Sequence, residues 1–101
     1  MKRIIVKYKV KEEKAQENID FIKKVFAGLE RTKPNGLKYA SFRLDDGLSF
    51  VHIVSIETED GSNPLVLLDE FKEFTKDIKS RCDEPPTASE VETIGDFRLF
   101  Q

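Results

Sequence analysis

Apolar and polar residues alternate along the first segment of the chain. Over residues 3–10, Ile4, Val6, Tyr8 and Val10 fall on one side, the period-two pattern of a half-buried strand. From residue 11 the apolar positions recur every three or four residues, which predicts an amphipathic helix over 12–31. The inward positions of this helix are Ala15, Ile19, Ile22, Phe26 and Leu29. Pro34 disfavours helical geometry at the residue before it and marks the end of the helix.

A long β-hairpin is predicted next. Two runs rich in β-branched and aromatic residues, 37–44 and 49–57, flank the turn-forming sequence Asp45-Asp46-Gly47. The second run is apolar on both faces, with Phe50, His52, Val54 and Ile56 on one and Val51 and Ile53 on the other. A strand of this kind is expected to be covered on both sides.

The last third predicts a helix and a strand. Asn63-Pro64 suits a helix start, and the helix over 64–81 is expected to direct Leu67, Leu68, Phe71, Phe74 and Ile78 inward. Residues 83–86, Asp-Glu-Pro-Pro, should end it, leaving a strand over 88–100 bent at Gly95-Asp96. The order β-α-β-β-α-β predicts an α+β, ferredoxin-like antiparallel sheet with two helices on one face, in a single domain spanning 1–101.

Composition narrows the classes of function. The 101 residues carry a net charge of −2, which argues against a general affinity for nucleic acid or for an anionic membrane. The RNA-recognition motif has the same element order, but it needs several exposed sheet aromatics and a basic surround, and here Phe50 is the one such aromatic. No apolar run reaches the roughly 18 residues of a membrane span. The single cysteine, Cys82, suits a reducing compartment, and we expect a cytoplasmic protein.

No metal or cofactor is expected. One histidine, one cysteine and scattered carboxylates have no recognised ligand spacing, and no glycine-rich phosphate loop is present.

The surplus of large apolar residues predicts a homodimer formed through the sheets. Each such side chain left in water forfeits roughly 1.5–3 kcal/mol of burial. A second subunit packed on the open sheet face would recover this free energy. The alternative is that the long C-terminal segment folds over that face.

The layout resembles the dimeric α/β-barrel superfamily, and within it the antibiotic-biosynthesis-monooxygenase-like proteins. The turn and strand at 46–52 carry the resemblance, together with 82–86 leading to the tail at 94–100. It implies two sheets forming a barrel across a two-fold axis and a cavity between sheet and helices in each subunit. Some members oxidise aromatic polyketides without metal or flavin, and others degrade haem.

The resemblance therefore implies a cofactor-independent monooxygenase-like protein that acts on, or binds, a small hydrophobic or aromatic molecule. This chain has no Trp, no Asn on its first strand, and its one histidine on a strand, so the family's catalytic residues do not carry over. The alternative is a non-catalytic dimer that binds a small ligand or has a structural role.

The candidate catalytic residues come from the hairpin. Tyr39, Ser41 and Arg43 share one face of their strand, and a two-residue turn would add His52 to it, opposite Ser41. A three-residue turn would place His52 on the other face, and the sequence does not choose. If they converge, Arg43 would hold a carboxylate or oxyanion while Tyr39 or His52 moves a proton. The ligand-binding candidates are Tyr8, Ser41 and Phe50.

His52 has two possible roles with different surroundings. A site histidine should border a cavity and reach Tyr8, Tyr39, Ser41 or Arg43 by hydrogen bond. A structural histidine should be packed by aliphatic side chains, with one nitrogen bonded to backbone or a carboxylate. The structural role is the commoner one for a mid-strand histidine, and the sequence favours it. An interface or surface role is likewise the commoner one for Arg43.

Overall fold

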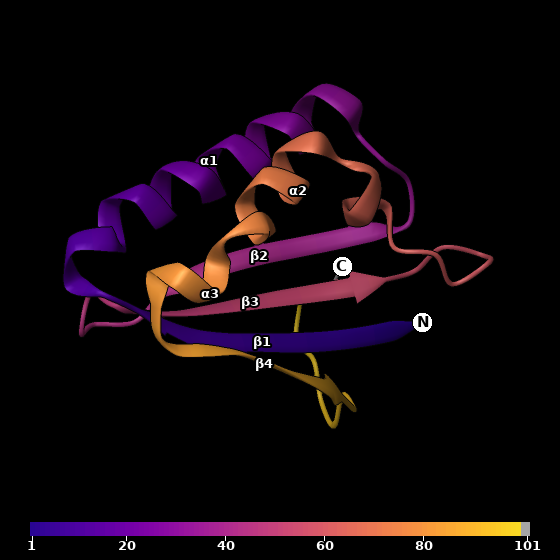
Figure 1. Cartoon of the computed structure of the whole chain (residues 1–101). Helices are drawn as coiled ribbons and strands as arrows, with labels where there is room; N and C mark the ends of the chain where they lie inside the picture. The colour runs from indigo at the N-terminus through magenta and orange to yellow at the C-terminus, as the bar shows by residue number, and fades with distance from the viewer. Residues whose placement is uncertain (100–101) are drawn as a thin grey trace.

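A four-stranded antiparallel sheet forms one layer of the protein. The computed structural model describes residues 1–99. Its strands are β1 (Lys2–Val10), β2 (Leu37–Arg43), β3 (Ser49–Ile56) and β4 (Cys82–Val91), in the order β2-β3-β1-β4 (Figure 1). This order and direction confirm the predicted ferredoxin-like sheet.

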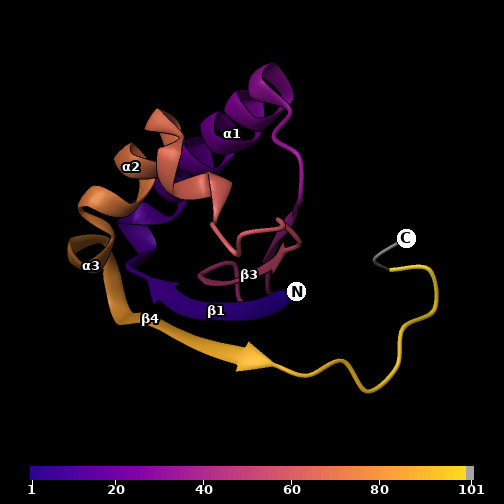
Figure 2. The same cartoon turned by 90° about the vertical axis from the view of Figure 1, so that its right-hand side faces the viewer.

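The helices form the second layer, and all lie on the same face of the sheet (Figures 1 and 2). They are η1 (Glu12–Lys14), α1 (Ala15–Thr32), η2 (Pro64–Leu67), α2 (Asp69–Lys76) and α3 (Ile78–Arg81). The buried apolar core lies between the layers and includes Tyr8, Val10, Val25, Phe50, Val54, Leu65 and Phe74. Helices on one face are as predicted. Among residues 1–99 no helix is both long and apolar enough to cross a membrane.

The prediction of one continuous helix over 64–81 is wrong, because the structure has the three separate segments η2, α2 and α3 there. Asn63 caps its first turn as expected, accepting from the backbone N–H of Leu65 at 3.0 Å, but that turn is a 3-10 helix. Three residues per turn put Leu65 and Leu68 on the same buried side and direct Leu67 outward, where it is 79% exposed. The prediction that Leu67 points inward is therefore wrong, and α2 begins only after Leu68, whose backbone is extended.

The fourth strand begins earlier than predicted. It runs over Cys82–Val91 rather than 88–100, so Pro85 and Pro86 lie inside it. An edge strand tolerates proline because its outer N–H groups need no ladder partner. The pairing with β1 shifts register between Lys7 and Lys9, opposite this proline pair. Residues 92–99 are outside any strand, so the expected bend at Gly95-Asp96 within a strand is also wrong, and Phe100 lies outside the described residues.

The hairpin loop fixes the register of β2 and β3. Leu44 donates its N–H to the carbonyl of Ser49 at 2.8 Å, which leaves a four-residue loop, 45–48. Asp46 organises this loop by accepting the backbone N–H groups of Leu48 and Ser49, at 2.8 and 2.7 Å. These bonds and the Ser49 hydroxyl lower the pKa of Asp46 to about 2, with the hydroxyl as the largest cause. The resulting register pairs Ser41 with His52.

The sheet face that points away from the helices is open. Phe42 is 49% exposed there, and Ile5, Val51 and Ile53 share this face by their register. The C-terminal segment does not cover it, because after β4 the chain swings away from the body (Figure 2). Its apolar residues Ile94, Phe97 and Leu99 are themselves exposed.

Candidate functional site

The strand register brings four of the predicted residues to one place on the helix-facing side of the sheet. Ser41 on β2 lies directly opposite His52 on β3, and Tyr39 is the next inward residue along β2. Tyr8 on β1 approaches His52 from the other neighbouring strand, since Tyr8 pairs with Phe50. His52 is therefore flanked by hydroxyl-bearing residues from both sides.

Both ring nitrogens of His52 are hydrogen-bonded to hydroxyl groups. Nε2 lies 2.7 Å from the hydroxyl of Tyr8, and Nδ1 lies 2.7 Å from the hydroxyls of both Tyr39 and Ser41. The ring is 4% exposed and stacks against Tyr8 and Tyr39, with Phe74 tilted against it at 5.5 Å. Its partners are neither backbone groups nor carboxylates.

Burial keeps these groups neutral. It lowers the pKa of His52 to about 4, so the imidazole is uncharged at neutral pH. Burial also raises the pKa of Tyr39 to about 12, although a hydrogen bond from the Ser41 hydroxyl partly offsets the rise. The pKa of Tyr8 is raised further, again chiefly by burial. The site is a neutral hydrogen-bonded cluster.

Asn18, on α1, is a member of this cluster that the sequence analysis missed. It is fully buried, and its Nδ2 donates to the Tyr8 hydroxyl at 2.9 Å. Its Oδ1 has no hydrogen-bond partner among the described residues. Asn18 lies three residues after Ala15 and four before Ile22, inside the apolar stripe of the helix. A polar residue at such a position is the signal that could have identified it.

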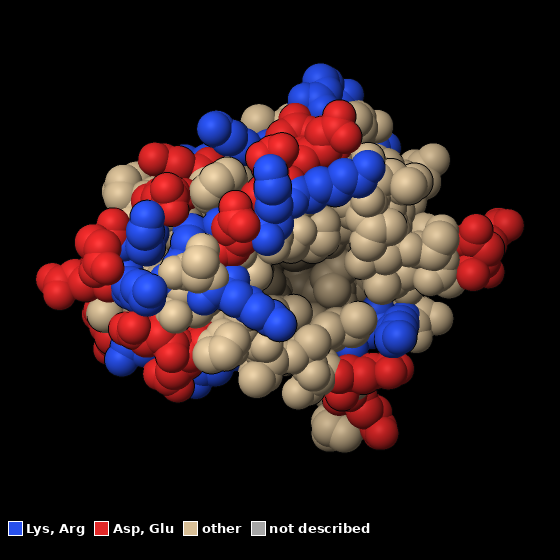
Figure 3. Space-filling view, in the orientation of Figure 1, with Lys and Arg blue, Asp and Glu red and all other residues tan. Residues whose placement is uncertain are grey.

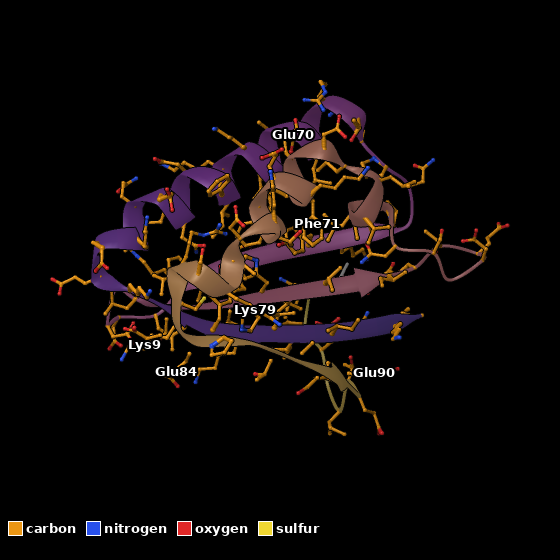
Figure 4. The ribbon with its side chains drawn as sticks, viewed as in Figure 1. Lys9, Glu70, Phe71, Lys79, Glu84 and Glu90 are labelled. Carbon is orange, nitrogen blue, oxygen red and sulfur yellow. The ribbon has the colours of Figure 1, made fainter. Side chains whose placement is uncertain are left out.

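A cavity of about 300 Å³ opens beside His52 and Tyr39, between the sheet and α2. Its walls are mostly apolar and include Ile4, Val6, Val54, Leu65, Phe71, Phe74, Ile78 and Ala88. Figure 3 shows a hollow on this side of the molecule, walled by uncharged residues with charged side chains around it. In the same orientation, Phe71 lies between α2 and the strands, and Lys79 of α3 lies near the hollow (Figure 4). The cavity suits a small apolar molecule that makes a few polar contacts.

Three of the predicted residues do not line this cavity. Ser41 contacts His52 but lines another groove of the surface. Phe50 is buried beneath Tyr8, with ring centroids 5.6 Å apart, and belongs to the core. Arg43 is exposed at the end of β2 and lines a different groove, together with Lys23 and Gln16 of α1. Ser41, the hydroxyl partner of His52, lines that groove too, but Arg43 does not border the cavity beside His52.

Arg81 is a second buried polar residue that the sequence analysis did not single out as part of this layer. Its guanidinium packs over Phe21 at 4.6 Å and donates to the backbone carbonyl of Phe74 at 2.5 Å. This contact holds the end of α2, and with it one wall of the cavity, against α1. Within residues 1–99 no group of three or more His, Cys, Asp or Glu side chains is arranged to bind a metal ion.

Solved structures share this arrangement of elements. A protein described as an antibiotic biosynthesis monooxygenase superposes with a TM-score of 0.70 at 16% identity, over 94% of this chain and all of the other. SnoaB, described as a cofactor-independent oxygenase from Streptomyces nogalater, gives 0.69 at 12% identity over 96% of both chains. A conserved protein from Methanosarcina mazei gives 0.68 at 20% identity over 89% of both chains. The chain has the fold of the antibiotic biosynthesis monooxygenase-like proteins.

The likeness extends over most of the chain but concerns the fold. No protein-family model matches the sequence, and no curated protein matches it. At identities of this level, the residues around the cavity must be judged by their own geometry. For this monooxygenase-like fold, the His52 cluster and its cavity are the features on which a function can be argued.

Proposed function

We propose that this protein binds a small aromatic molecule in the cavity beside His52 and oxidises it with molecular oxygen, without a metal or flavin. The observation that carries the proposal is a mostly apolar cavity of about 300 Å³ that His52 and Tyr39 border. Apolar walls favour an aromatic ligand, and a few polar groups fix its orientation. The fold shared with a protein described as a cofactor-independent oxygenase supports the choice of reaction.

The reaction balances with oxygen as the oxidant and the ligand as the reductant. A doubly benzylic CH₂ group, as in an anthrone, becomes a carbonyl when one oxygen atom is retained. The second oxygen atom leaves as water with the two hydrogens, so the carbon loses four electrons and O₂ gains four. The protein's part is to remove the first proton from carbon, since the resulting carbanion is the species that reacts with O₂.

We assign the removal of that proton to His52, beside which Tyr39 also borders the cavity. A pKa near 4 makes His52 a weak base if it must keep the proton as an imidazolium ion. The hydroxyl contacts offer the proton no further exit, because the hydroxyl of Tyr8 otherwise meets only the donating Nδ2 of Asn18. His52 would therefore hold the proton as an imidazolium ion beside the carbanion and return it to the peroxide formed with O₂, from which water leaves.

A non-catalytic ligand-binding protein is the second candidate function. The same low pKa of His52 favours it, because a cluster that stays neutral can serve simply to hydrogen-bond a ligand. Oxygen consumption distinguishes the two candidates.

The test of binding uses the absence of tryptophan from this chain. Thr75 on α2 borders the cavity, so Thr75→Trp introduces a fluorescent reporter at its mouth. Glu73 on the same helix is exposed and does not border the cavity, so Glu73→Trp is the matched control. Titration with an anthrone should change the emission of the first variant and leave that of the second unaltered. Equal responses would mean that the anthrone does not occupy the cavity.

The test of catalysis measures oxygen uptake by the unmodified protein with the same anthrone. Uptake that disappears in His52→Gln, while the ligand still binds, supports the oxygenase. Binding with no uptake assigns the protein to the non-catalytic class.

We further propose that the protein is a cytoplasmic homodimer in which the open sheet faces pack together. The exposed Phe42 and its apolar neighbours on that face support this proposal, and so does the C-terminal segment, which leaves the face uncovered. The single cysteine, Cys82, is buried and unpaired, which suits a reducing compartment.

A further inference from the structure

The hydrogen bonds of the buried cluster can be assigned a direction, starting from Asn18. An amide nitrogen only donates, so the oxygen of Tyr8 accepts from Asn18 Nδ2 at 2.9 Å. Tyr8 is 2% exposed, and its own hydroxyl hydrogen therefore needs an acceptor inside the protein. Its other polar contact among the described residues is His52 Nε2, at 2.7 Å. Nε2 must then be the unprotonated nitrogen that accepts this hydrogen.

The directions of the remaining hydrogen bonds, on the Nδ1 side of His52, follow from the neutral state of the imidazole. A neutral ring with Nε2 as acceptor carries its one proton on Nδ1. Nδ1 lies 2.7 Å from the oxygens of both the Ser41 and the Tyr39 hydroxyls. With its proton on Nδ1, the ring donates toward these oxygens, so the Tyr39 oxygen is an acceptor in this contact. The hydroxyl hydrogen of Tyr39 is then directed away from Nδ1, and of the two hydroxyl residues Tyr39 is the one that borders the cavity.

We infer that this chain of hydrogen bonds runs from Asn18 toward the cavity and ends in a hydrogen-bond donor, the Tyr39 hydroxyl. The cavity would therefore select a ligand with an acceptor oxygen, an aryl ketone or a quinone carbonyl. This inference rests on the proposed function for its ligand but not for its direction. A phenol fits less well, because its own hydrogen would meet a Tyr39 oxygen that already accepts from Nδ1–H of His52.

Two other polar side chains border the cavity, Asn63 and Thr75. The side-chain oxygen of Asn63 accepts from the backbone N–H of Leu65, so its Nδ2 is a second hydrogen-bond donor at the start of η2. The hydroxyl of Thr75 donates to backbone carbonyls of its own helix, with Phe71 at 3.0 Å. Tyr39→Phe therefore separates the contribution of Tyr39 from that of Asn63.

Reversing the chain would require an acceptor at position 18. If residue 18 accepted from Tyr8, the tyrosine oxygen would accept from Nε2–H, and Nδ1 would accept from Ser41 or Tyr39. Asn18→Asp makes this change with little change in shape, because an ionised carboxylate only accepts. The two directions therefore predict opposite tautomers of His52.

The single histidine makes this measurable without any ligand. Protein labelled with ¹⁵N-histidine gives one imidazole spin system, in which the two nitrogen shifts identify the protonated nitrogen. We expect a protonated Nδ1 in the natural sequence and a protonated Nε2 in Asn18→Asp. A protonated Nε2 in the natural sequence overturns the inference. That result is decisive even if Asn18→Asp does not fold.

The ligand half is tested with a pair of probes of nearly equal shape, 1-tetralone, which carries a ketone, and tetralin, which carries none. One neutral hydrogen bond contributes about 0.5–1.5 kcal/mol net, so tetralone should bind roughly 3- to 10-fold more tightly. The preference should disappear in Tyr39→Phe. Equal affinity for the two probes in the natural sequence overturns the inference while leaving the cavity as a binding site. If neither probe binds, the ligand part falls together with the proposed function, and the tautomer measurement still decides the direction of the chain.

Discussion

Removing the Tyr8 hydroxyl should destabilise the protein far more than removing the Tyr39 hydroxyl. In Tyr8→Phe the Nδ2 of Asn18 and the Nε2 of His52 both lose their partner, and both residues are almost fully buried. Each buried polar group left without a partner costs about 1–3 kcal/mol, so the free energy of unfolding should fall by about 2–5 kcal/mol. In Tyr39→Phe, Nδ1 of His52 keeps Ser41, and water can enter from the cavity. The expected loss there is about 1 kcal/mol.

Urea unfolding followed by circular dichroism, at one fixed protein concentration, gives these differences if the slope with denaturant is unchanged. The double variant Tyr8→Phe, Asn18→Leu should lose less free energy of unfolding than the sum of the two single variants. The reason is that the double variant leaves no unpaired amide nitrogen. We expect a coupling of more than about 1 kcal/mol in this double-mutant cycle. Additive effects, or a smaller loss for Tyr8→Phe than for Tyr39→Phe, would refute the view that these contacts form one connected network.

Two other predictions concern pH and assembly. Because His52 has a folded-state pKa of about 4 against an ordinary value of 6.5, its contribution to stability should be complete above about pH 6.5 and lost as the pH falls toward 4. The shift corresponds to about 3 kcal/mol of the free energy of unfolding. His52→Gln should lack this part of the pH dependence, and parallel stability-against-pH curves for the two proteins would contradict the prediction. In sedimentation, Phe42→Lys should yield monomers, whereas Val66→Lys, at an equally exposed apolar residue on the helical side, should leave a dimer; a monomer before any substitution would reject the proposed interface.

Much of the fold was predictable because its signals are local. Period-two alternation places Tyr8 inward on β1, and the hairpin pattern places Tyr39 and Ser41 on one face of β2. The position of His52 depended on the loop length alone, since a shift of one residue would have moved it to the other face. Asp46 fixes the length of the loop by accepting hydrogen bonds from two backbone N–H groups. The sequence shows the aspartate but not these contacts.

The parts that were not predictable depend on tertiary packing. Helical periodicity joined η2, α2 and α3 into one helix because Leu67 and Leu68 fit the same pattern, whereas the core accepts only Leu68. Pro85 and Pro86 suggested the end of a helix and a delay before the strand. The edge position of β4 and its shifted register against β1 accommodate them inside the strand.

Asn18 is a polar residue at an inward position of α1, within a stripe that is otherwise apolar. An apolar residue at this inward position of α1 would satisfy the helix and leave no unpaired amide oxygen. Stability alone therefore does not explain an asparagine there, nor a histidine at 52 whose burial opposes its charged form. A network kept only for structure would be expected to close upon itself, with every polar group paired. This network instead runs from a buried amide to Tyr39, which borders an apolar cavity, and this open end supports the proposal that Tyr39 meets a ligand.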